Sequence, residues 1–204
     1  FERALHGAVF AMPAVQRGAL WFGSHTFPAL TLSPRGLDIK PTDNKAARRK
    51  LRVAYRSLSQ REGGAERVLE PHTLVNTGLR WHVRAYSEDT CDFRDFVLSR
   101  ITAAQCLEAP AESGEQYDDD WVESVSLVLA PHAGLDAARR ESLLLDYGAS
   151  GEVIEVHVRR ALLGYVLQRL SVDTTPDHAL NPNAYQLMLL NRDEIEPFAA
   201  WAFR

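Results

Sequence analysis

The sequence contains few cysteines and no long hydrophobic run. Only Cys91 and Cys106 occur among its 204 residues, which is too few for a disulfide framework and favours a reducing, cytoplasmic compartment. The longest apolar stretches fall far short of the roughly 20 residues that a membrane helix requires, so we expect no membrane span. No signal peptide opens the chain, and because Phe1 is not an initiator residue we expect a fragment without its natural N-terminus.

An excess of positive charge is also missing. The 23 Lys and Arg residues face 27 Asp and Glu residues, which gives a formal net charge of −4. This balance excludes a uniformly basic, nucleic-acid-binding surface but permits a local basic patch. The composition is otherwise typical of a globular protein, with 46% hydrophobic and 25% charged residues, and the length suffices for one large domain or two small ones.

The spacings that mark common catalytic and metal sites are absent. The seven histidines show no HxH or HExxH spacing, the two cysteines form no CxxC pair, and no GxGxxG or Walker loop occurs. The segment 148–151, Gly-Ala-Ser-Gly, lacks the spacing of a nucleophile elbow. The acidic run at 118–120 fits a solvated linker better than a divalent-ion site. We therefore expect no catalytic residue, no enzyme activity, no metal and no cofactor.

Strand-like alternation begins at Leu51. There Leu51, Val53 and Tyr55 alternate with polar or small residues, which is typical of a half-buried strand. Three further strands are predicted, one starting at Arg67 and the others over 79–87 and 96–103. Four short antiparallel strands in about 50 residues predict a small β-barrel.

An acidic segment divides the chain. Residues 108–120 are rich in Asp and Glu and contain Pro110 and Gly114, so they are predicted to be an interdomain linker. Beyond it, strand, helix, strand and helix patterns follow at 121–130, 135–147, 153–158 and 159–170. The predicted fold class is α+β, a small barrel followed by a small α/β domain. The predicted parts are a connector, the barrel, the linker and the C-terminal domain: 1–41, 42–107, 108–120 and 121–204.

Basic and aromatic polar residues gather on one face of the strand at 79–87. Alternation places Arg80, His82, Arg84 and Tyr86 together, and further polar groups come from neighbouring segments: Arg56, Ser57, Arg94 and Arg100. Guanidinium forks match phosphate oxygens two at a time, so this face suits an anionic ligand, most plausibly a nucleotide or a short nucleic acid. The alternative is a solvated outer face whose arginines pair with acidic neighbours: Glu88, Asp89, Asp92 and Asp95.

The same segments carry a family resemblance. Residues 53–57, 71–75, 80–86 and 93–101 together resemble a WYL domain, with Trp81-His82-Val83 in place of the namesake tripeptide. The His form is similar to the WYL regulators found beside bacterial phage-defence islands of the BREX and CBASS types. Two later segments resemble the C-terminal extension of that branch: 158–170 and 185–191.

The resemblance implies a bacterial transcriptional repressor in three parts. An N-terminal winged helix-turn-helix would bind operator DNA, and because no such pattern fits before Leu51, we expect it to be missing here, with 1–41 as its connector. An Sm-like or SH3-like WYL barrel would sense the ligand, and the C-terminal domain would form a homodimer. The alternative for the helix at 159–170 is that its apolar stripe packs on its own sheet.

The resemblance also implies a ligand-binding set. Four residues match polar positions around the WYL pocket, Ser57, His82, Arg84 and Arg94, and three match motif positions that are either ligand contacts or structural, Tyr55, Tyr86 and Arg100. Trp81 is assigned to the core because Val83 and Ala85 share its face. The expected effector is a nucleotide or single-stranded nucleic acid. The alternative is an interaction module whose basic face contacts DNA backbone or a protein partner without sensing a small ligand.

Overall fold

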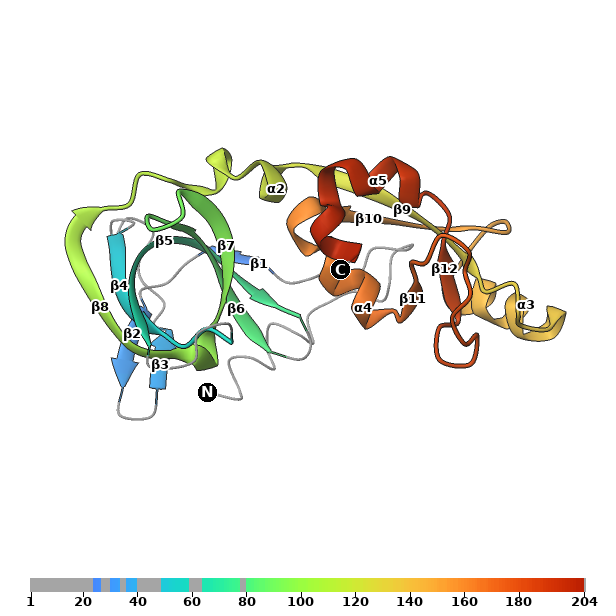
Figure 1. Cartoon of the computed structure of the whole chain (residues 1–204), viewed down its shortest axis with the longest axis horizontal. Coiled ribbons are helices and arrows are strands. Elements are labelled where there is room, and N and C mark those ends of the chain that lie inside the picture. Colours follow the sequence, from blue (N-terminus) through green and yellow to red (C-terminus); the bar gives the residue numbers. More distant parts are fainter. Residues whose placement is uncertain are drawn as a thin grey trace. The chain divides into compact units, whose positions relative to one another are not determined.

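The structure is a computed structural model that describes residues 24–26, 30–33, 36–39, 49–58, 64–77 and 80–203 (Figure 1). The described residues form two compact units, a first unit that ends at Val122 and a second unit that begins at Glu123. Most of the predicted connector, residues 1–41, lies outside the described residues. The α+β class is confirmed, since both units combine antiparallel strands with short helices.

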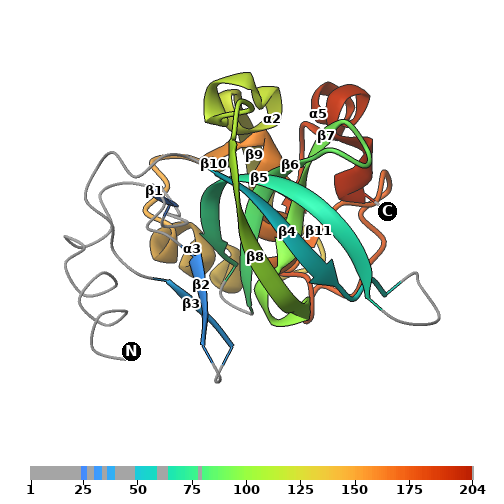
Figure 2. The ribbon, with the colours of Figure 1, turned by 90° about the vertical axis from the view of Figure 1, so that its left-hand side faces the viewer.

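The first unit is built on one curled antiparallel sheet. Five strands follow the order β7-β6-β5-β4-β8, and β1 (Ser24–Thr26) pairs with the end of β5. The bounds of the five are β4 (Arg49–Tyr55), β5 (Ala65–Asn76), β6 (Trp81–Ser87), β7 (Asp92–Val97) and β8 (Ile101–Pro110). A separate hairpin joins β2 (Leu30–Ser33) to β3 (Gly36–Ile39). Figure 2 shows β4, β5 and β8 side by side in this sheet.

The predicted barrel is wrong in one respect, because the sheet does not close. Among the described residues, β7 and β8 stand at opposite ends of the strand order and make no ladder with each other. The three-residue turn η1 (Leu98–Arg100) connects β7 to β8, and the hydrogen bonding between strands is interrupted there. The strands nevertheless curl far enough for η1 to bridge the ends of β6 and β4 (Figure 1).

The core of the first unit fills the inside of the curl. The alternation predicted from Leu51 is confirmed, because Leu51, Val53 and Tyr55 are buried and their neighbours are more exposed. Trp81 packs against the core, as predicted. The buried core residues are Leu51, Val53, Tyr55, Leu69, Leu74, Val83, Ala85, Phe96 and Ile101.

The second unit is a four-stranded sheet with three α-helices. Its order is β10-β9-β12-β11, antiparallel except for the β11–β12 pair. The strands are β9 (Ser124–Pro131), β10 (Ile154–Arg159), β11 (Val172–Asp173) and β12 (Leu187–Leu189), and the helices are α3 (Ala137–Asp146), α4 (Leu163–Arg169) and α5 (Arg192–Ala199). The first predicted strand starts later than expected, because Trp121 lies in the short helix α2 (Asp119–Val122).

Asp173 anchors the loop that follows β11. Its side chain is fully buried and accepts hydrogen bonds from the Thr175 backbone N–H at 2.8 Å, the Thr175 hydroxyl at 2.6 Å and the Leu180 N–H at 2.9 Å. Burial alone would raise the pKa of this carboxyl, but these hydrogen bonds outweigh it and lower the pKa. The loop is therefore held by an ionised, fully bonded aspartate.

Replacing Asp173 with asparagine should lower the free energy of unfolding by about 2 kcal/mol, because one oxygen becomes an NH2 group that meets a backbone donor. Urea unfolding at neutral pH measures the change. Asp177→Asn is the matched control, since Asp177 is exposed in the same loop. Equal stabilities for the two variants would contradict the anchoring role.

Candidate functional site

Five of the seven predicted ligand residues lie on strands, divided between the two faces of the sheet, and the other two lie outside the strands. Residues directly opposite each other in a ladder lie on the same face. Arg94 stands opposite the buried core residue Ala85, so it lies on the inner side, as does Tyr55. The outer face of β6 carries His82, Arg84 and Tyr86. Ser57 follows β4, and Arg100 ends η1.

Tyr55 is used inside the fold. Its hydroxyl accepts a hydrogen bond from the Val97 N–H at 3.3 Å, and its ring meets Phe96 edge to face at 5.2 Å. The side chain is 7% exposed. Of the two interpretations that the motif left open for Tyr55, these contacts favour the structural one.

Arg84 lies in a buried network of carboxylates. Its Nε and Nη2 donate to the two oxygens of Asp118 at 2.6 and 2.9 Å, and its Nη1 donates to Asp95 at 3.3 Å. Asp120 stands 3.7 Å from Nη2. Arg84 and Asp118 are only 5% and 1% exposed. The prediction that the run at 118–120 is a solvated linker is therefore wrong for Asp118, whose carboxylate is buried against the guanidinium.

His72 completes this network from β5. The register of β5 with β6 shifts between Pro71 and Thr73, so His72 is the extra residue of a β-bulge. Its Nε2 lies 3.1 Å from Asp118 Oδ2, and its Nδ1 lies 2.9 Å from the Thr73 hydroxyl. The ring also makes edge contacts with Phe93 and Trp121. The sequence did not predict a role for His72, because a bulge reverses the alternation of inner and outer side chains along the strand.

Asp118 belongs to residues 111–122, a segment that we call the strap. A second buried contact holds the strap on the sheet. The Glu70 carboxylate is 3% exposed and accepts the backbone N–H groups of Glu112 and Ser113 at 2.7 and 2.6 Å. It also pairs with the Lys50 ammonium at 3.0 Å. Burial alone would raise the pKa of Glu70, but these donors outweigh it and lower the pKa. The strap is thus fastened to the outer face of the sheet at two points.

Asp118 should make the stability of the first unit pH-dependent. Burial opposes ionisation, but the hydrogen bonds from His72 and Arg84 outweigh it and lower the pKa of Asp118 from 3.8 to about 2. A carboxyl whose pKa is lower in the folded state contributes stability above its unfolded pKa and loses it as the pH falls through the folded pKa. Ionised Asp118 should therefore contribute on the order of 2 kcal/mol above about pH 4, lost between about pH 4 and 2.

The difference in unfolding free energy between the unmodified chain and Asp118→Asn isolates this contribution from the other carboxylates. It should shrink towards zero as the pH is lowered from about 4 to about 2. A difference that stays constant over this range would contradict an ionised, buried Asp118.

Three arginines, a serine and a buried histidine surround η1. The Arg56 N–H donates to the Arg100 carbonyl at 3.0 Å, and Val97, just before η1, pairs with His82. Burial lowers the pKa of His82, the charge of Asp95 opposes this, and the positive charges of Arg80 and Arg100 add to the lowering. No carboxylate of the described residues forms a salt bridge with Arg56, Arg80 or Arg100. We call this group the η1 corner: Arg56, Ser57, Arg80, His82 and Arg100.

Most other basic residues of the sheet have acidic partners, whereas Arg52 contacts the side chain of Gln105. Arg94, whose side chain is 56% exposed, lies 3.6 Å from Asp92, and Arg67 lies 3.0 Å from Asp89. Lys50 contacts Glu88 as well as Glu70. Pairing with acidic neighbours, the alternative left open by the sequence, thus describes Arg84 and Arg94, although Arg84 is buried rather than solvated. The arginines of the η1 corner pair with no described carboxylate, so they are available to an external anion.

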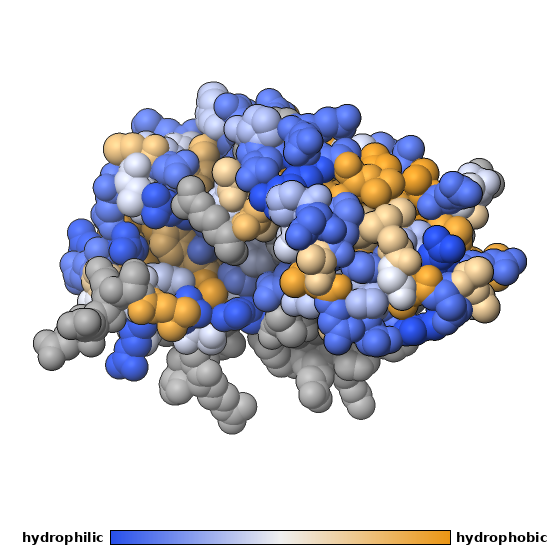
Figure 3. Space-filling view, turned by 45° about the vertical axis from the view of Figure 1, so that its right-hand side comes forward, coloured by the Kyte–Doolittle hydropathy of each residue, from blue (hydrophilic) through white to orange (hydrophobic). Residues whose placement is uncertain are grey.

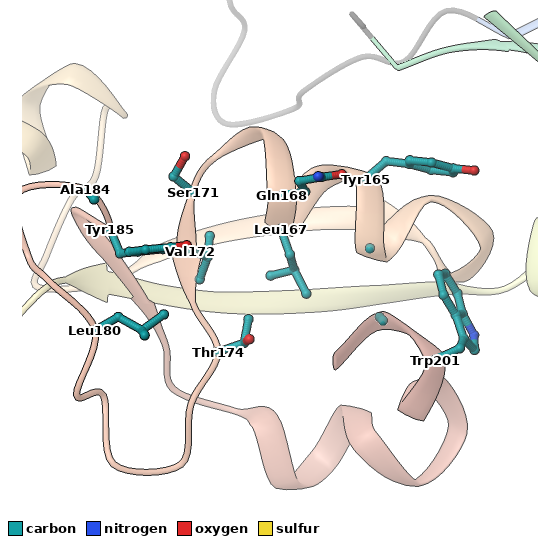
Figure 4. Close-up of a pocket in the computed structure, with 12 residues that line it drawn as sticks. Tyr165, Leu167, Gln168, Ser171, Val172, Thr174, Leu180, Ala184, Tyr185 and Trp201 are labelled. Atoms are coloured by element: carbon teal, nitrogen blue, oxygen red, sulfur yellow. The ribbon is translucent and has the colours of Figure 1, made fainter. Parts of the chain in front are cut away.

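The second unit contains an open pocket of about 770 Å³ (Figure 4). Leu167, Leu180 and Tyr185 line it, and the ring of Trp201 lies against Gly164, where an added Cβ would stand 3.1 Å from the indole. None of its lining residues carries a charge. This pocket therefore lacks the groups that an anionic ligand requires.

Among the described residues, no group of three or more His, Cys, Asp and Glu side chains is arranged to hold a metal ion. No helix in the described part of the chain is long and apolar enough to cross a membrane.

Comparison with protein families finds two matches. Residues 45–106 match the WYL domain, and residues 124–195 match the C-terminal dimerization domain of the BrxR transcriptional regulator. The first match covers most of the curled sheet, and the second covers most of the second unit.

Comparison with curated proteins finds DNA-binding transcriptional repressors named CapW. The chain is 43% identical over 149 residues to the repressor of Pseudomonas aeruginosa, covering 72% of this chain and 48% of that protein. It is 40% identical over 143 residues to that of Escherichia coli strain KTE188, covering 70% and 47%, and 35% identical over 124 residues to that of Stenotrophomonas maltophilia, covering 61% and 41%. The chain thus spans about half the length of the curated relatives it matches.

Among solved structures, the proteasome accessory factor PafBC of Arthrobacter aurescens aligns with 76% of this chain and 24% of its own. The TM-score of 0.31 and identity of 18% are too low to support an inference. The family matches and the repressor relatives agree with each other and with the two-unit fold. The chain therefore contains a WYL domain followed by a domain of the BrxR C-terminal dimerization family, and it is similar over about 70% of its length to the CapW repressors.

Proposed function

We propose that this chain is the sensing and dimerising part of a transcriptional repressor that controls a phage-defence system. An anionic effector, a nucleotide or single-stranded nucleic acid, binds the WYL domain at the η1 corner. The observation that carries the proposal is that Arg56, Arg80 and Arg100 form no salt bridge with a described carboxylate, whereas the cations that flank them in the sheet do: Lys50, Arg67, Arg84 and Arg94. Guanidinium groups that pair with no described carboxylate are available for bidentate binding of phosphate oxygens.

Each residue of the η1 corner has a chemical role in this proposal. Arg80 and Arg100 supply the positive charge, and the half-buried Ser57 offers a hydroxyl. His82, whose pKa is lowered, is neutral at pH 7 and so recognises a ligand by hydrogen bonding rather than by charge. Arg84 follows His82 on the outer face of β6, and Tyr55 supports the corner from the core through its hydrogen bond with Val97. Tyr86 and Arg94 lie further along β6 and β7 and have no role in this proposal.

Dimerisation is assigned to the second unit. Figure 3 shows hydrophobic side chains grouped on the surface of this unit. Its large exposed hydrophobic residues are Leu145, Val153, Leu190 and Trp201. A homodimer would cover part of this surface, and operator binding would come from a DNA-binding domain of the whole protein.

Replacing Arg100 with alanine should weaken effector binding about tenfold, because one charged hydrogen-bonding fork is lost. Fluorescence anisotropy of a labelled single-stranded DNA of about ten nucleotides measures it, with ATP and a cyclic dinucleotide as unlabelled competitors. Arg140→Ala is the control, because Arg140 is exposed on α3 of the second unit and the substitution changes the charge equally.

Three outcomes separate the possible functions. Weaker binding by Arg100→Ala alone supports a site at the η1 corner, and the competitors show whether nucleotide or oligonucleotide is preferred. Equal binding of duplex and single-stranded DNA, with a steep dependence on salt, would instead indicate contact with the DNA backbone and no sensing. Absence of binding to every probe would contradict the proposal.

A further inference from the structure

We propose that the strap is an internal competitor of the effector: the Asp118 carboxylate occupies an anion site made by Arg84 and His72, and a phosphate of the effector displaces it and releases the strap. The inference rests on the proposed function and adds a second subsite to it. In this inference residues 111–122 regulate effector binding, a role that lies outside the η1 corner.

The geometry around Asp118 is that of a bound anion. One carboxylate receives two parallel N–H groups from Arg84, at 2.6 and 2.9 Å, and a third contact from His72 Nε2 at 3.1 Å. Arginine binds two oxygens of a phosphate with the same guanidinium fork. The site is buried, so its donors would be costly to leave without an acceptor. An anion must replace Asp118 if the strap leaves.

The exchange of anions is close to neutral in charge. Asp120, 3.7 Å from Arg84 Nη2, belongs to the strap and would leave with Asp118, whereas Asp95 on β7 would stay on Nη1. Two carboxylates would depart, and a phosphate brings comparable negative charge. A neutral ligand could not make this exchange, because it would leave Arg84 with too few acceptors.

The second subsite is within reach of the first. His82 and Arg84 lie on the same face of β6, and two residues of extended chain span about 7 Å. An effector with more than one phosphate can therefore place one at the η1 corner and another at Arg84. A ligand with a single phosphate would bind the corner and leave the strap in place.

Release of the strap would reach the second unit through the chain itself. The strap connects β8 with β9, and its last turn contains Trp121. This side chain is buried, and the centroid of its ring lies 5.8 Å from that of His72. Displacing Asp118 removes one of the two contacts that fasten the strap to the sheet, the one beside this turn. The effector would then favour a state with the strap released, because it binds Arg84 only in that state.

The test compares three forms of the full 204-residue chain: unmodified, Asp118→Asn and Asp119→Asn. Asp119 is the adjacent exposed aspartate, so its substitution removes the same charge from the same segment. Binding of the labelled oligonucleotide of about ten nucleotides is measured for each. Amide hydrogen exchange of residues 111–122 is measured on the unmodified chain with and without the probe, which needs no variant to fold.

We expect Asp118→Asn to bind the probe about tenfold more tightly and Asp119→Asn to bind as the unmodified chain does. The probe should also accelerate exchange in the strap of the unmodified chain. Equal affinity of all three forms, with strap exchange unchanged by bound probe, would overturn the inference and leave the proposed function intact. No binding by any form would overturn both.

Discussion

Replacing Arg84 with methionine is expected to lower the free energy of unfolding of the first unit by about 3–5 kcal/mol, the cost of breaking a buried ion pair from one side. Methionine keeps the length of the side chain but leaves Asp118 and Asp95 without the guanidinium that both contact. Asp118 is 1% exposed, so water cannot replace the lost donors without movement of the strap. Denaturant unfolding followed by tryptophan fluorescence measures the loss.

The matched control is Arg94→Met on the neighbouring strand. Arg94 is largely exposed and its contact with Asp92 is 3.6 Å, so its loss should change stability by less than about 1 kcal/mol. The double variant Arg84→Met with Asp118→Leu should recover part of the loss, because the buried charge disappears along with its partner. Arg84 and Arg94 variants of equal stability would show that the buried network has no structural role.

The second large effect is expected at Glu70. Replacing it with glutamine should lower the free energy of unfolding by about 3 kcal/mol, because a charged acceptor of two backbone N–H groups and an ammonium becomes a neutral amide. The Glu112 and Ser113 amides should also exchange faster. Unfolding and hydrogen exchange are measured on the same sample.

Glu66→Gln is the control for Glu70, since Glu66 is exposed on the same strand. It should leave both stability and strap exchange unchanged. If Glu70→Gln lowers stability while strap amides keep their protection, then Glu70 acts through Lys50 alone and does not fasten the strap.

The sequence predicted those parts of the first unit that depend on local pattern. The alternation of Leu51, Val53 and Tyr55 identified the inner face of β4, and the apolar neighbours of Trp81 placed it against the core. These predictions succeeded because each needs only the period of two along a single strand.

The face of Arg94 could not be predicted in the same way. It depends on the register of β7 with β6, and in that register Asp95 rather than Arg94 stands opposite Arg84. A shift of one residue moves a side chain to the other face, and the turn that fixes this register gives no clear signal in the sequence. Grouping Arg94 with Arg84 was an assumption about register.

The burial of Arg84 required knowledge of a distant segment. Asp118 lies 34 residues further along the chain, and its neighbours Asp119 and Asp120 are more exposed, so the acidic run has the composition of a solvated linker. Only the tertiary fold shows that one of the three aspartates turns inward.

Photo-cross-linking tests the central claim, that the η1 corner of the WYL domain binds an anionic effector, most directly. A single-stranded DNA of about ten nucleotides carrying photoreactive bases is irradiated with the full chain, and the cross-linked peptides are identified by mass spectrometry. The account predicts cross-links within residues 56–57 and 80–100, suppressed in Arg100→Ala. Cross-links confined to residues 123–203, or unaffected by that substitution, would contradict it.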